Sequence, residues 1–249
     1  MAKNNNNNNN SYGTDRKRAD NLLNMEAIAF QIRESYKTAR TNIVYSIIKK
    51  GCKKISFTSA NKGEGKTVTS VNIAIALAQQ VNTRVLIIDC DLRRPQIHNV
   101  LSIAFAPGLT NYLNGECSKD EVVRSTKINN LSAITYGAIP PNPSELLSSE
   151  SMREFIKELE KDYDYIIFDT PPVGVVIDSL PLVKQSDGVV LVIKHNSTTY
   201  PDLKKIIETI NRNNGKILGI IVNSVDSVKS HKYGKGYGYG YGYGYGYGY

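Results

Sequence analysis

Short runs of β-branched residues alternate with amphipathic segments along most of the chain, and this alternation limits the folds open to it. We expect strands at 54–58, 84–88, 130–135, 164–168, 188–194 and 216–222. We expect helices at 67–80, 144–161, 180–185 and 200–213. Strands that alternate with helices form a parallel sheet, because parallel neighbours need crossover connections. The sequence therefore predicts a doubly wound α/β fold with a mainly parallel sheet.

The two ends of the chain differ in composition from this alternating part. Residues 1–24 include an asparagine tract at 4–10, and residues 229–249 end in strict Gly-Tyr alternation. Neither segment has enough apolar residues to offset the entropy of ordering it, so we expect both to be flexible tails. The part between them, 25–228, is predicted to be one domain that opens with an amphipathic helix at 25–49.

The net charge of +8 is concentrated at the ends of the chain. Residues 1–50 carry nine Lys/Arg against four Asp/Glu, and residues 229–249 carry three lysines and no acid. Residues 51–228 are therefore neutral overall. A basic arm can contact nucleic acid, an anionic membrane surface or an acidic partner, and solubility alone explains it equally well.

The sequence also indicates a compartment. Its apolar runs are far shorter than the roughly 20 residues of a membrane span, and its first residues lack a hydrophobic signal region. The cysteines, Cys52, Cys90 and Cys117, have no metal-ligand spacing and fit a reducing environment without disulfides. We therefore expect a cytoplasmic protein.

A glycine-rich segment follows the first predicted strand. Residues 59–67 read Ser-Ala-Asn-Lys-Gly-Glu-Gly-Lys-Thr and lead into a helix. Glycines there let backbone N–H groups surround phosphate oxygens, and the helix N-terminus adds a positive dipole. The segment fits the P-loop pattern G-x-x-x-x-G-K-[ST] except at its first position, Ala60. The expected ATP contacts are Asn61, Lys62, Gly63, Glu64, Gly65, Lys66, Thr67 and Val68.

Several side chains near this loop are suited to a magnesium nucleotide. Lys66 would place its charge on the β- and γ-phosphates, and the Thr67 hydroxyl would ligate Mg²⁺. Asp89 and Asp91 follow one hydrophobic strand and Asp169 follows another. A single acid there would often be a strand-end cap, but three beside one P-loop favour metal coordination. The predicted Mg²⁺ ligands are Thr67, Asp89, Asp91 and Asp169.

The motifs A-N-K-G-E-G-K-T, V-L-I-I-D-C-D-L-R-R-P and Y-I-I-F-D-T-P-P resemble those of the deviant-Walker P-loop ATPases. With the tyrosine-rich tail, residues 25–249 resemble the bacterial tyrosine kinases (BY-kinases) of Gram-positive capsule and exopolysaccharide operons. The resemblance implies a P-loop NTPase fold. It makes Lys66 the catalytic lysine, Thr67 a Mg²⁺ ligand and Asp169 the Walker B acid. Asp89 and Asp91 would form the second acidic motif, and either is a candidate base for the acceptor phenol.

The resemblance also implies partners. These are other copies of the chain in a ring-like homo-oligomer, a cytosolic segment of a membrane polysaccharide co-polymerase that activates the kinase, and a tyrosine phosphatase. It places the protein at the inner face of the cell membrane, where it would control polysaccharide synthesis and export. No nucleic-acid partner is expected.

The sequence departs from the kinase pattern at two lysines. Segment 34–40 resembles a subunit-contact motif, but Lys37 stands where the family usually has arginine. Lys62 stands where these kinases often have proline, and it resembles the signature lysine of partition and division-site ATPases. A switch ATPase of that type, without kinase activity, is therefore the alternative function.

The tail holds eight of the chain's 16 tyrosines. Alternating Gly-Tyr could act as an adhesive segment. We favour a substrate role, because the same chain carries an ATP site and glycine lets the tail enter an active site. The expected phosphorylation sites are Tyr233, Tyr237, Tyr239, Tyr241, Tyr243, Tyr245, Tyr247 and Tyr249. Other tyrosines are expected to be packing residues, namely Tyr36, Tyr45, Tyr112, Tyr136, Tyr163, Tyr165 and Tyr200.

Overall fold

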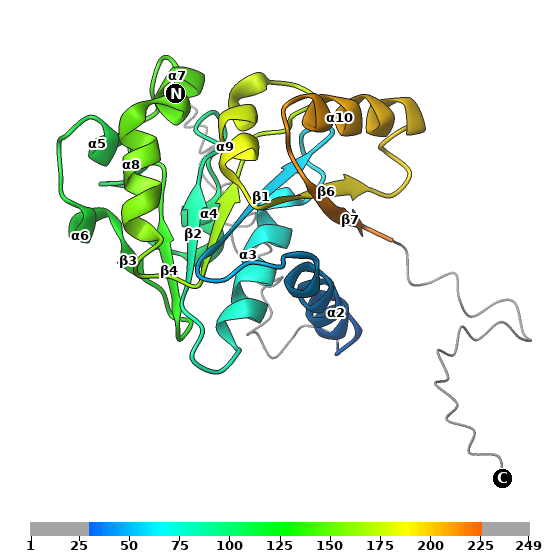
Figure 1. Ribbon diagram of the computed structural model, residues 1–249, viewed down its shortest axis with the longest axis horizontal. Coiled ribbons are helices and arrows are strands. Elements are labelled where there is room, and N and C mark those ends of the chain that lie inside the picture. The colour runs from blue at the N-terminus through cyan, green and yellow to red at the C-terminus, as the bar shows by residue number, and fades with distance from the viewer. Residues whose placement is uncertain (1–29, 226–249) are drawn as a thin grey trace, which may run out of the picture.

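A computed structural model of the chain describes residues 30–225 and shows one sheet with helices on both faces (Figure 1). The sheet has seven strands in the order β3-β4-β2-β5-β1-β6-β7. The strands are β1 (Lys53–Ser59), β2 (Val85–Asp89), β3 (Arg124–Ser125), β4 (Leu131–Ile134), β5 (Tyr165–Asp169), β6 (Gly188–Lys194) and β7 (Ile217–Asn223). Only the β3–β4 pair is antiparallel among these strands. The predicted doubly wound, mainly parallel fold is confirmed.

Helices cover the two faces in separate groups. The helices are α2 (Phe30–Ser46), α3 (Lys66–Ala78), α4 (Ile97–Leu101), α5 (Leu109–Leu113), α6 (Lys119–Val122), α7 (Pro143–Ser148), α8 (Glu150–Leu159), the 3₁₀ turn η1 (Ile177–Ser179), α9 (Leu180–Gln185) and α10 (Tyr200–Arg212). α2, α3 and α4 share one core with the sheet, and α8 packs into the core on the other face. α10 packs into a smaller core with residues of β6. In the part of the chain that the structure describes, no helix is long and apolar enough to cross a membrane.

Neighbouring residues of the central strands enter opposite cores. Ile87 of β2 packs with α3, whereas Leu86 packs with α8. The same division separates Ile167 from Ile166 in β5. Successive side chains of a strand point to opposite faces, so strands buried on both faces must be apolar throughout. This burial gives the sheet a rigid edge from which site residues can project.

Most predicted elements are found within a few residues of their expected ends. The predicted helix at 144–161 is wrong as a single helix: it is broken at Ser149, whose ψ of 158° is not helical. The Ser149 hydroxyl accepts the N–H of Met152 and so caps the start of α8. The first predicted helix, 25–49, ends earlier than expected, at Ser46, and its predicted start lies outside the described residues. The predicted domain boundaries, after residues 24 and 228, lie outside the described residues.

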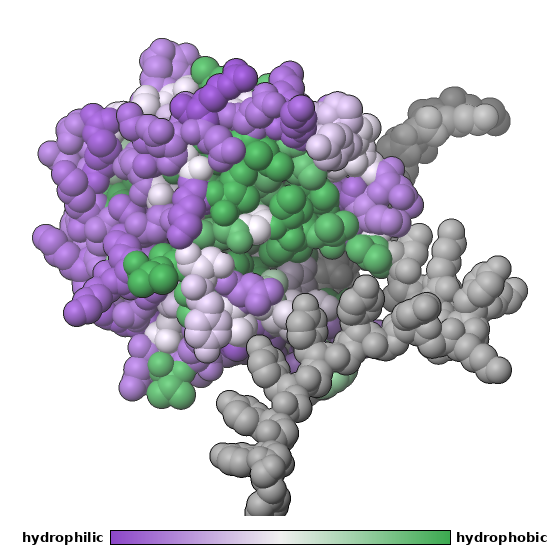
Figure 2. Space-filling view, turned by 45° about the vertical axis from the view of Figure 1, so that its right-hand side comes forward, coloured by the Kyte–Doolittle hydropathy of each residue, from purple (hydrophilic) through white to green (hydrophobic). Residues whose placement is uncertain are grey.

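One side of the molecule is notably apolar. Figure 2 brings forward the right-hand side of Figure 1, where β7 and α10 lie, and shows apolar residues gathered at its centre. β7 is the last strand of the sheet on this side, and its Ile220 and Val222 are exposed. At the opposite edge, β3 contributes only two residues to the ladder. The sheet therefore ends in one short edge and one long apolar edge.

Candidate nucleotide-binding site

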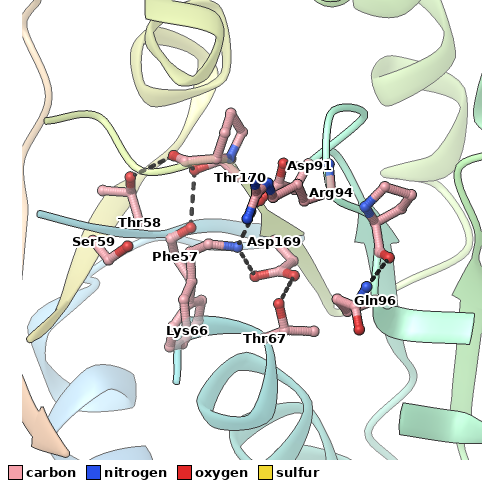
Figure 3. Close-up of polar contacts among 12 residues, drawn as sticks. Phe57, Thr58, Ser59, Lys66, Thr67, Asp91, Arg94, Gln96, Asp169 and Thr170 are labelled. Atoms are coloured by element: carbon pink, nitrogen blue, oxygen red, sulfur yellow. Dashed lines mark hydrogen bonds and ion pairs between the residues drawn. The ribbon is translucent and has the colours of Figure 1, made fainter. Parts of the chain in front are cut away.

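The P-loop lies where β1 ends and α3 begins, beside the carboxyl ends of β2 and β5. In the ladder, Asp89 of β2 is level with Asp169 of β5, which is also level with Phe57 of β1. This register brings the acids of two strands to the loop that follows a third. Figure 3 shows Lys66, Thr67, Asp91 and Asp169 directed toward one another at this point. The structure thus brings these four predicted residues together.

The backbone of the loop depends on its glycines. Gly63 and Gly65 have φ values of 78° and 84°, in the left-handed region that favours glycine. Gly65 has a second constraint, because a Cβ there would lie 1.8 Å from Nδ2 of Asn223. Its carbonyl oxygen accepts the N–H of Thr69 at 2.9 Å, which starts the hydrogen bonding of α3. A side chain at residue 65 would therefore strain the loop backbone and push aside the side chain of Asn223.

Lys66 is held between two carboxylates. Its side chain is only 7% exposed, and its Nζ lies 2.8 Å from Oδ1 of Asp169 and 3.6 Å from Oδ2 of Asp91. Burial opposes the charge of Lys66, but these acids outweigh the burial and raise its pKa. Thr67 donates its hydroxyl to Oδ2 of Asp169 at 2.6 Å. Both oxygens of Asp169 therefore bind residues of the P-loop.

The two acids of the second motif occupy different environments. Asp89 is fully buried, and its Oδ2 accepts the N–H groups of Gln96 and Ile97, each at 3.0 Å. Its other oxygen, Oδ1, is buried without a hydrogen-bond partner. Burial and the nearby charge of Asp169 raise the pKa of Asp89. Asp91 lies farther out: its Oδ1 accepts the N–H of Arg94 at 3.1 Å, and burial raises its pKa.

The donor set fits a magnesium ion bound together with a nucleotide. Mg²⁺ prefers oxygen ligands and usually takes one or two carboxylates, phosphate oxygens and water. Thr67 and Asp169 offer such oxygens, and the unpartnered Oδ1 of Asp89 can accept a hydrogen bond from a metal-bound water. Among the described residues, no three His, Cys, Asp or Glu side chains already form a metal-binding group. Such a sparse set is suited to a metal that arrives with phosphates.

A cavity of about 550 Å³ opens beside the loop. Its volume lies within the range of about 300–1,000 Å³ that is usual for small-molecule sites. All eight predicted nucleotide contacts line it, from Asn61 to Val68, together with Asp91 and Arg93. Asp89 and Asp169 lie behind this lining. A larger cavity, of about 680 Å³, lies near the amino ends of β2 and β5 and contains none of the predicted site residues.

Sequence reasoning missed the contacts on the other side of the loop. Glu64 is a predicted nucleotide contact and lines the cavity, but it is only 2% exposed, and its carboxylate binds other parts of the protein. Its Oε2 accepts the N–H of Asn61 at 2.8 Å, and its Oε1 accepts the hydroxyl of Thr198. Nδ2 of Asn223 donates to the main-chain oxygen of Glu64 at 3.1 Å. Thr198 and Asn223 are 134 and 159 residues away from Glu64, and no local pattern signals them.

A second missed contact holds Arg93 at the cavity wall. Its Nε and Nη2 lie 2.5 and 3.3 Å from the two oxygens of Asp178, which is buried in η1. A two-pronged contact of this kind fixes the plane of a guanidinium group. The signal in the sequence was an isolated acid inside the apolar run Val-Val-Ile-Asp-Ser-Leu.

The remaining predicted positions have mixed outcomes. Tyr45 and Tyr200 are 81% and 77% exposed, so their prediction as packing residues is wrong. The packing prediction is confirmed for Tyr36, Tyr112, Tyr136, Tyr163 and Tyr165. In segment 34–40, Lys37 pairs with Glu34 at 2.7 Å and Arg40 donates to the carbonyl oxygen of Ala76 at 3.2 Å. The expected phosphorylation sites all lie outside the described residues.

Comparison with known proteins relates this site to a family. A family model described as an AAA domain matches residues 52–218. The chain is 40% identical to tyrosine-protein kinase YwqD of Bacillus subtilis over 201 residues, which cover 81% of this chain and 84% of that protein. It is 37% identical to tyrosine-protein kinase CpsD of Streptococcus pneumoniae serotype 4 over 202 residues, which cover 81% and 87% of the two chains. The kinase domain of Escherichia coli tyrosine kinase ETK superposes with a TM-score of 0.76 at 30% identity, covering 83% of this chain and 80% of that one.

Proposed function

This chain belongs to the family of tyrosine-protein kinases with an AAA domain, and we propose that it transfers the γ-phosphate of ATP to tyrosines of its own C-terminal tail. One observation carries the proposal: a buried lysine of a P-loop is held by two strand-end acids at a cavity of nucleotide size. The tail supplies the acceptor hydroxyls within the same chain.

The chemistry is one phosphoryl transfer. The phenolic oxygen of tyrosine bonds to the γ-phosphorus, the bond from that phosphorus to the β–γ bridging oxygen breaks, and ADP leaves. The phenol loses its proton to a carboxylate during the transfer. Lys66 and the N–H groups of the loop stabilise the negative charge on the phosphate oxygens. This reaction needs positioned charge more than a covalent intermediate, so the P-loop and its acids can be sufficient.

We assign the proton acceptor to Asp91. Its carboxylate lines the cavity, whereas Asp89 is fully buried behind that lining. A general base must reach the proton that it removes, either directly or through one water. Asp89 is instead suited to the metal side of the site, because its Oδ2 is already fixed by two N–H groups and its Oδ1 is free to accept.

A magnesium ion would be held by Thr67 and Asp169, with Asp89 contacting its water shell. When bound, Mg²⁺ supplies positive charge to the β- and γ-phosphate oxygens. Oγ1 of Thr67 and Oδ2 of Asp169 lie 2.6 Å apart, close enough for both to contact one ion.

Membership of this family also supports a proposal about the cellular role of the protein. We infer that the kinase regulates capsule or exopolysaccharide synthesis and export from the inner face of the cell membrane. There it would assemble with other copies of itself and be activated by a cytosolic segment of a membrane co-polymerase. A tyrosine phosphatase would remove the phosphate from its tyrosines. The basic ends of the chain suit a place beside anionic lipids.

The alternative function is a partition-type switch ATPase. One observation favours it: Lys62, the residue typical of that class, is exposed and lines the cavity. The kinase proposal gives this lysine no catalytic task. ATP turnover without any phosphotyrosine would support the alternative.

The test of the proposed function is incubation of the purified full-length chain with Mg-ATP, followed by mass spectrometry of phosphotyrosine. Lys66→Met is the matched control, because it removes the charge with little change in size. We expect phosphate on tail tyrosines of the wild type, more of it when the activating membrane segment is added, and none on Lys66→Met. A folded Lys66→Met protein with wild-type phosphorylation would contradict the proposal.

A further inference from the structure

Glu64 is the residue at which contacts from two other segments reach the P-loop. Thr198, in the turn after β6, donates its hydroxyl to the carboxylate of Glu64. Asn223, the last residue of β7, donates its side-chain amide to the carbonyl oxygen of the same residue at 3.1 Å. These two contacts hold the side chain and the main chain of Glu64 from β6 and β7, across β1 from the strands that carry the catalytic acids.

The burial of Glu64 makes these contacts necessary. A carboxylate that is 2% exposed loses most of its hydration and needs hydrogen-bond donors in exchange. The hydrogen-bond donors to this carboxylate are neutral, namely the N–H of Asn61 and the hydroxyl of Thr198. Hydrogen bonds to a charged group are roughly twice as strong as neutral ones. The loss of the Thr198 hydroxyl would therefore leave one oxygen of a buried charge unpaired.

We propose that Thr198 is a positioning residue for the nucleotide site and acts on it through Glu64. The inference rests on the proposed ATP site. With Thr198 in place, the Glu64 carboxylate holds the N–H of Asn61 and so closes residues 61–64 into a fixed turn. The phosphate-binding part of the loop then has its bound shape before a ligand arrives. A site ordered in advance spends less of its binding energy on ordering.

Thr198 also connects this turn to a helix. The next residue, Thr199, caps α10, because its side chain accepts the N–H of Asp202 at 3.3 Å. Two adjacent threonines therefore have separate tasks, one on the P-loop and one on α10. A movement of α10 would reach the loop through Thr198, and nucleotide binding would in turn steady the start of α10.

The adjacent threonines offer a matched experiment. Thr198→Val keeps the shape and removes the hydroxyl, Thr198→Ser restores a hydroxyl, and Thr199→Val removes the cap of α10 alone. The measurements on full-length protein are the Kd of a fluorescent ADP with Mg²⁺, the KM for ATP and kcat. We expect Thr198→Val to weaken ADP binding by about tenfold, because part of the binding energy must then order the loop. Its KM should rise by a similar factor with a smaller change in kcat.

The remaining variants decide between positioning and mere stability. Thr198→Ser should bind ADP like the wild type, and Thr199→Val should melt at a lower temperature but keep its ADP affinity. Thr198→Ala tests the same prediction through a different change in shape. Unchanged ADP affinity in both Thr198→Val and Thr198→Ala, or an equal loss in Thr199→Val, would overturn the inference. If wild type and Lys66→Met bound ADP equally weakly, the proposed ATP site itself would fail, which is a separate result.

Discussion

The two sides of the P-loop are built from different kinds of contact. On the side of β2 and β5, Lys66 is paired with Asp169 and Asp91 at 2.8 and 3.6 Å. On the side of β6 and β7, Glu64 is held by a threonine hydroxyl and an asparagine amide. The first set consists of charges that phosphate and metal can exchange for new partners. The second set consists of neutral donors that no ligand needs to displace.

This difference between the two sides of the P-loop separates the residues that take part in phosphoryl transfer from those that hold the loop in its conformation. Residues on the charged side should change kcat and metal dependence when they are altered. Residues on the neutral side should change nucleotide affinity and loop stability, because they contact the loop and not the reacting atoms. The predictions below each test one side of this division.

The largest effect is expected for Asp91→Asn on the charged side. Loss of a general base typically lowers the rate by about 10²- to 10⁴-fold. We expect kcat to fall within that range while the KM for ATP changes little, as measured by steady-state autophosphorylation. An active Asp91→Asn protein, beside an inactive Asp89→Asn protein, would move the base to Asp89.

The next effect concerns Gly65 on the neutral side. Gly65→Ala should destabilise the protein and weaken ADP binding, because its Cβ would lie 1.8 Å from Nδ2 of Asn223. Adding Asn223→Ala removes that collision but leaves the left-handed backbone, which costs a non-glycine residue about 1–2 kcal/mol. A double-mutant cycle by urea unfolding should therefore show that the two changes together cost less than their sum. If the two changes in the free energy of unfolding were strictly additive, the predicted steric clash between residues 65 and 223 would be contradicted.

A smaller effect, on stability, is expected from Asp89→Asn. The raised pKa of Asp89 means that the folded state binds its proton more tightly than the unfolded state, where the pKa is about 3.9. The stability contributed by this group is therefore present at low pH and is lost as pH rises through the folded-state value. Asp89→Asn removes the titration and keeps an acceptor for the N–H groups of Gln96 and Ile97. Thermal unfolding without ligand should show a larger gain for the mutant at pH 8 than at pH 5, and an equal effect at both would contradict the assignment.

The smallest effect is expected for Lys62→Ala. The side chain is exposed, and exposed substitutions usually change free energies by less than about 0.5 kcal/mol. Phosphotyrosine formation should therefore stay within about twofold to threefold of the wild type. Complete loss of ATP turnover, as in Lys66→Met, would favour the partition-type function.

The charged side could be predicted from the sequence because each of its residues lies at or just after the end of a hydrophobic strand, or opens a helix. In a parallel sheet such positions meet at one edge, so Lys66, Asp91 and Asp169 could be brought together without coordinates. The strand limits followed from the same apolar runs, and β6 begins and ends where the sequence predicted.

The neutral side could not be predicted, because its contacts depend on the packing of distant segments. Thr198 is one of several hydroxyl residues in a turn, and only the fold places it against Glu64. The break at Ser149 was missed for a related reason: helical periodicity continues through it, while a single capping hydroxyl divides the helix. The different environments of Asp89 and Asp91 likewise arise from main-chain N–H groups, which a list of side chains does not reveal.

The unequal edges of the sheet limit how copies of this chain can associate. A long strand with free N–H and C=O groups can pair with another chain, while a two-residue strand offers little to pair with. Among the described strands, β7 is thus the only long edge strand that is open. The described sheet can therefore be extended by strand pairing at one edge only. If two copies paired through β7, neither would have a second long edge for another copy, and the assembly would be a two-fold dimer. A closed ring needs two different surfaces on every subunit, so pairing between the edges of the described sheet cannot by itself close a ring of this chain.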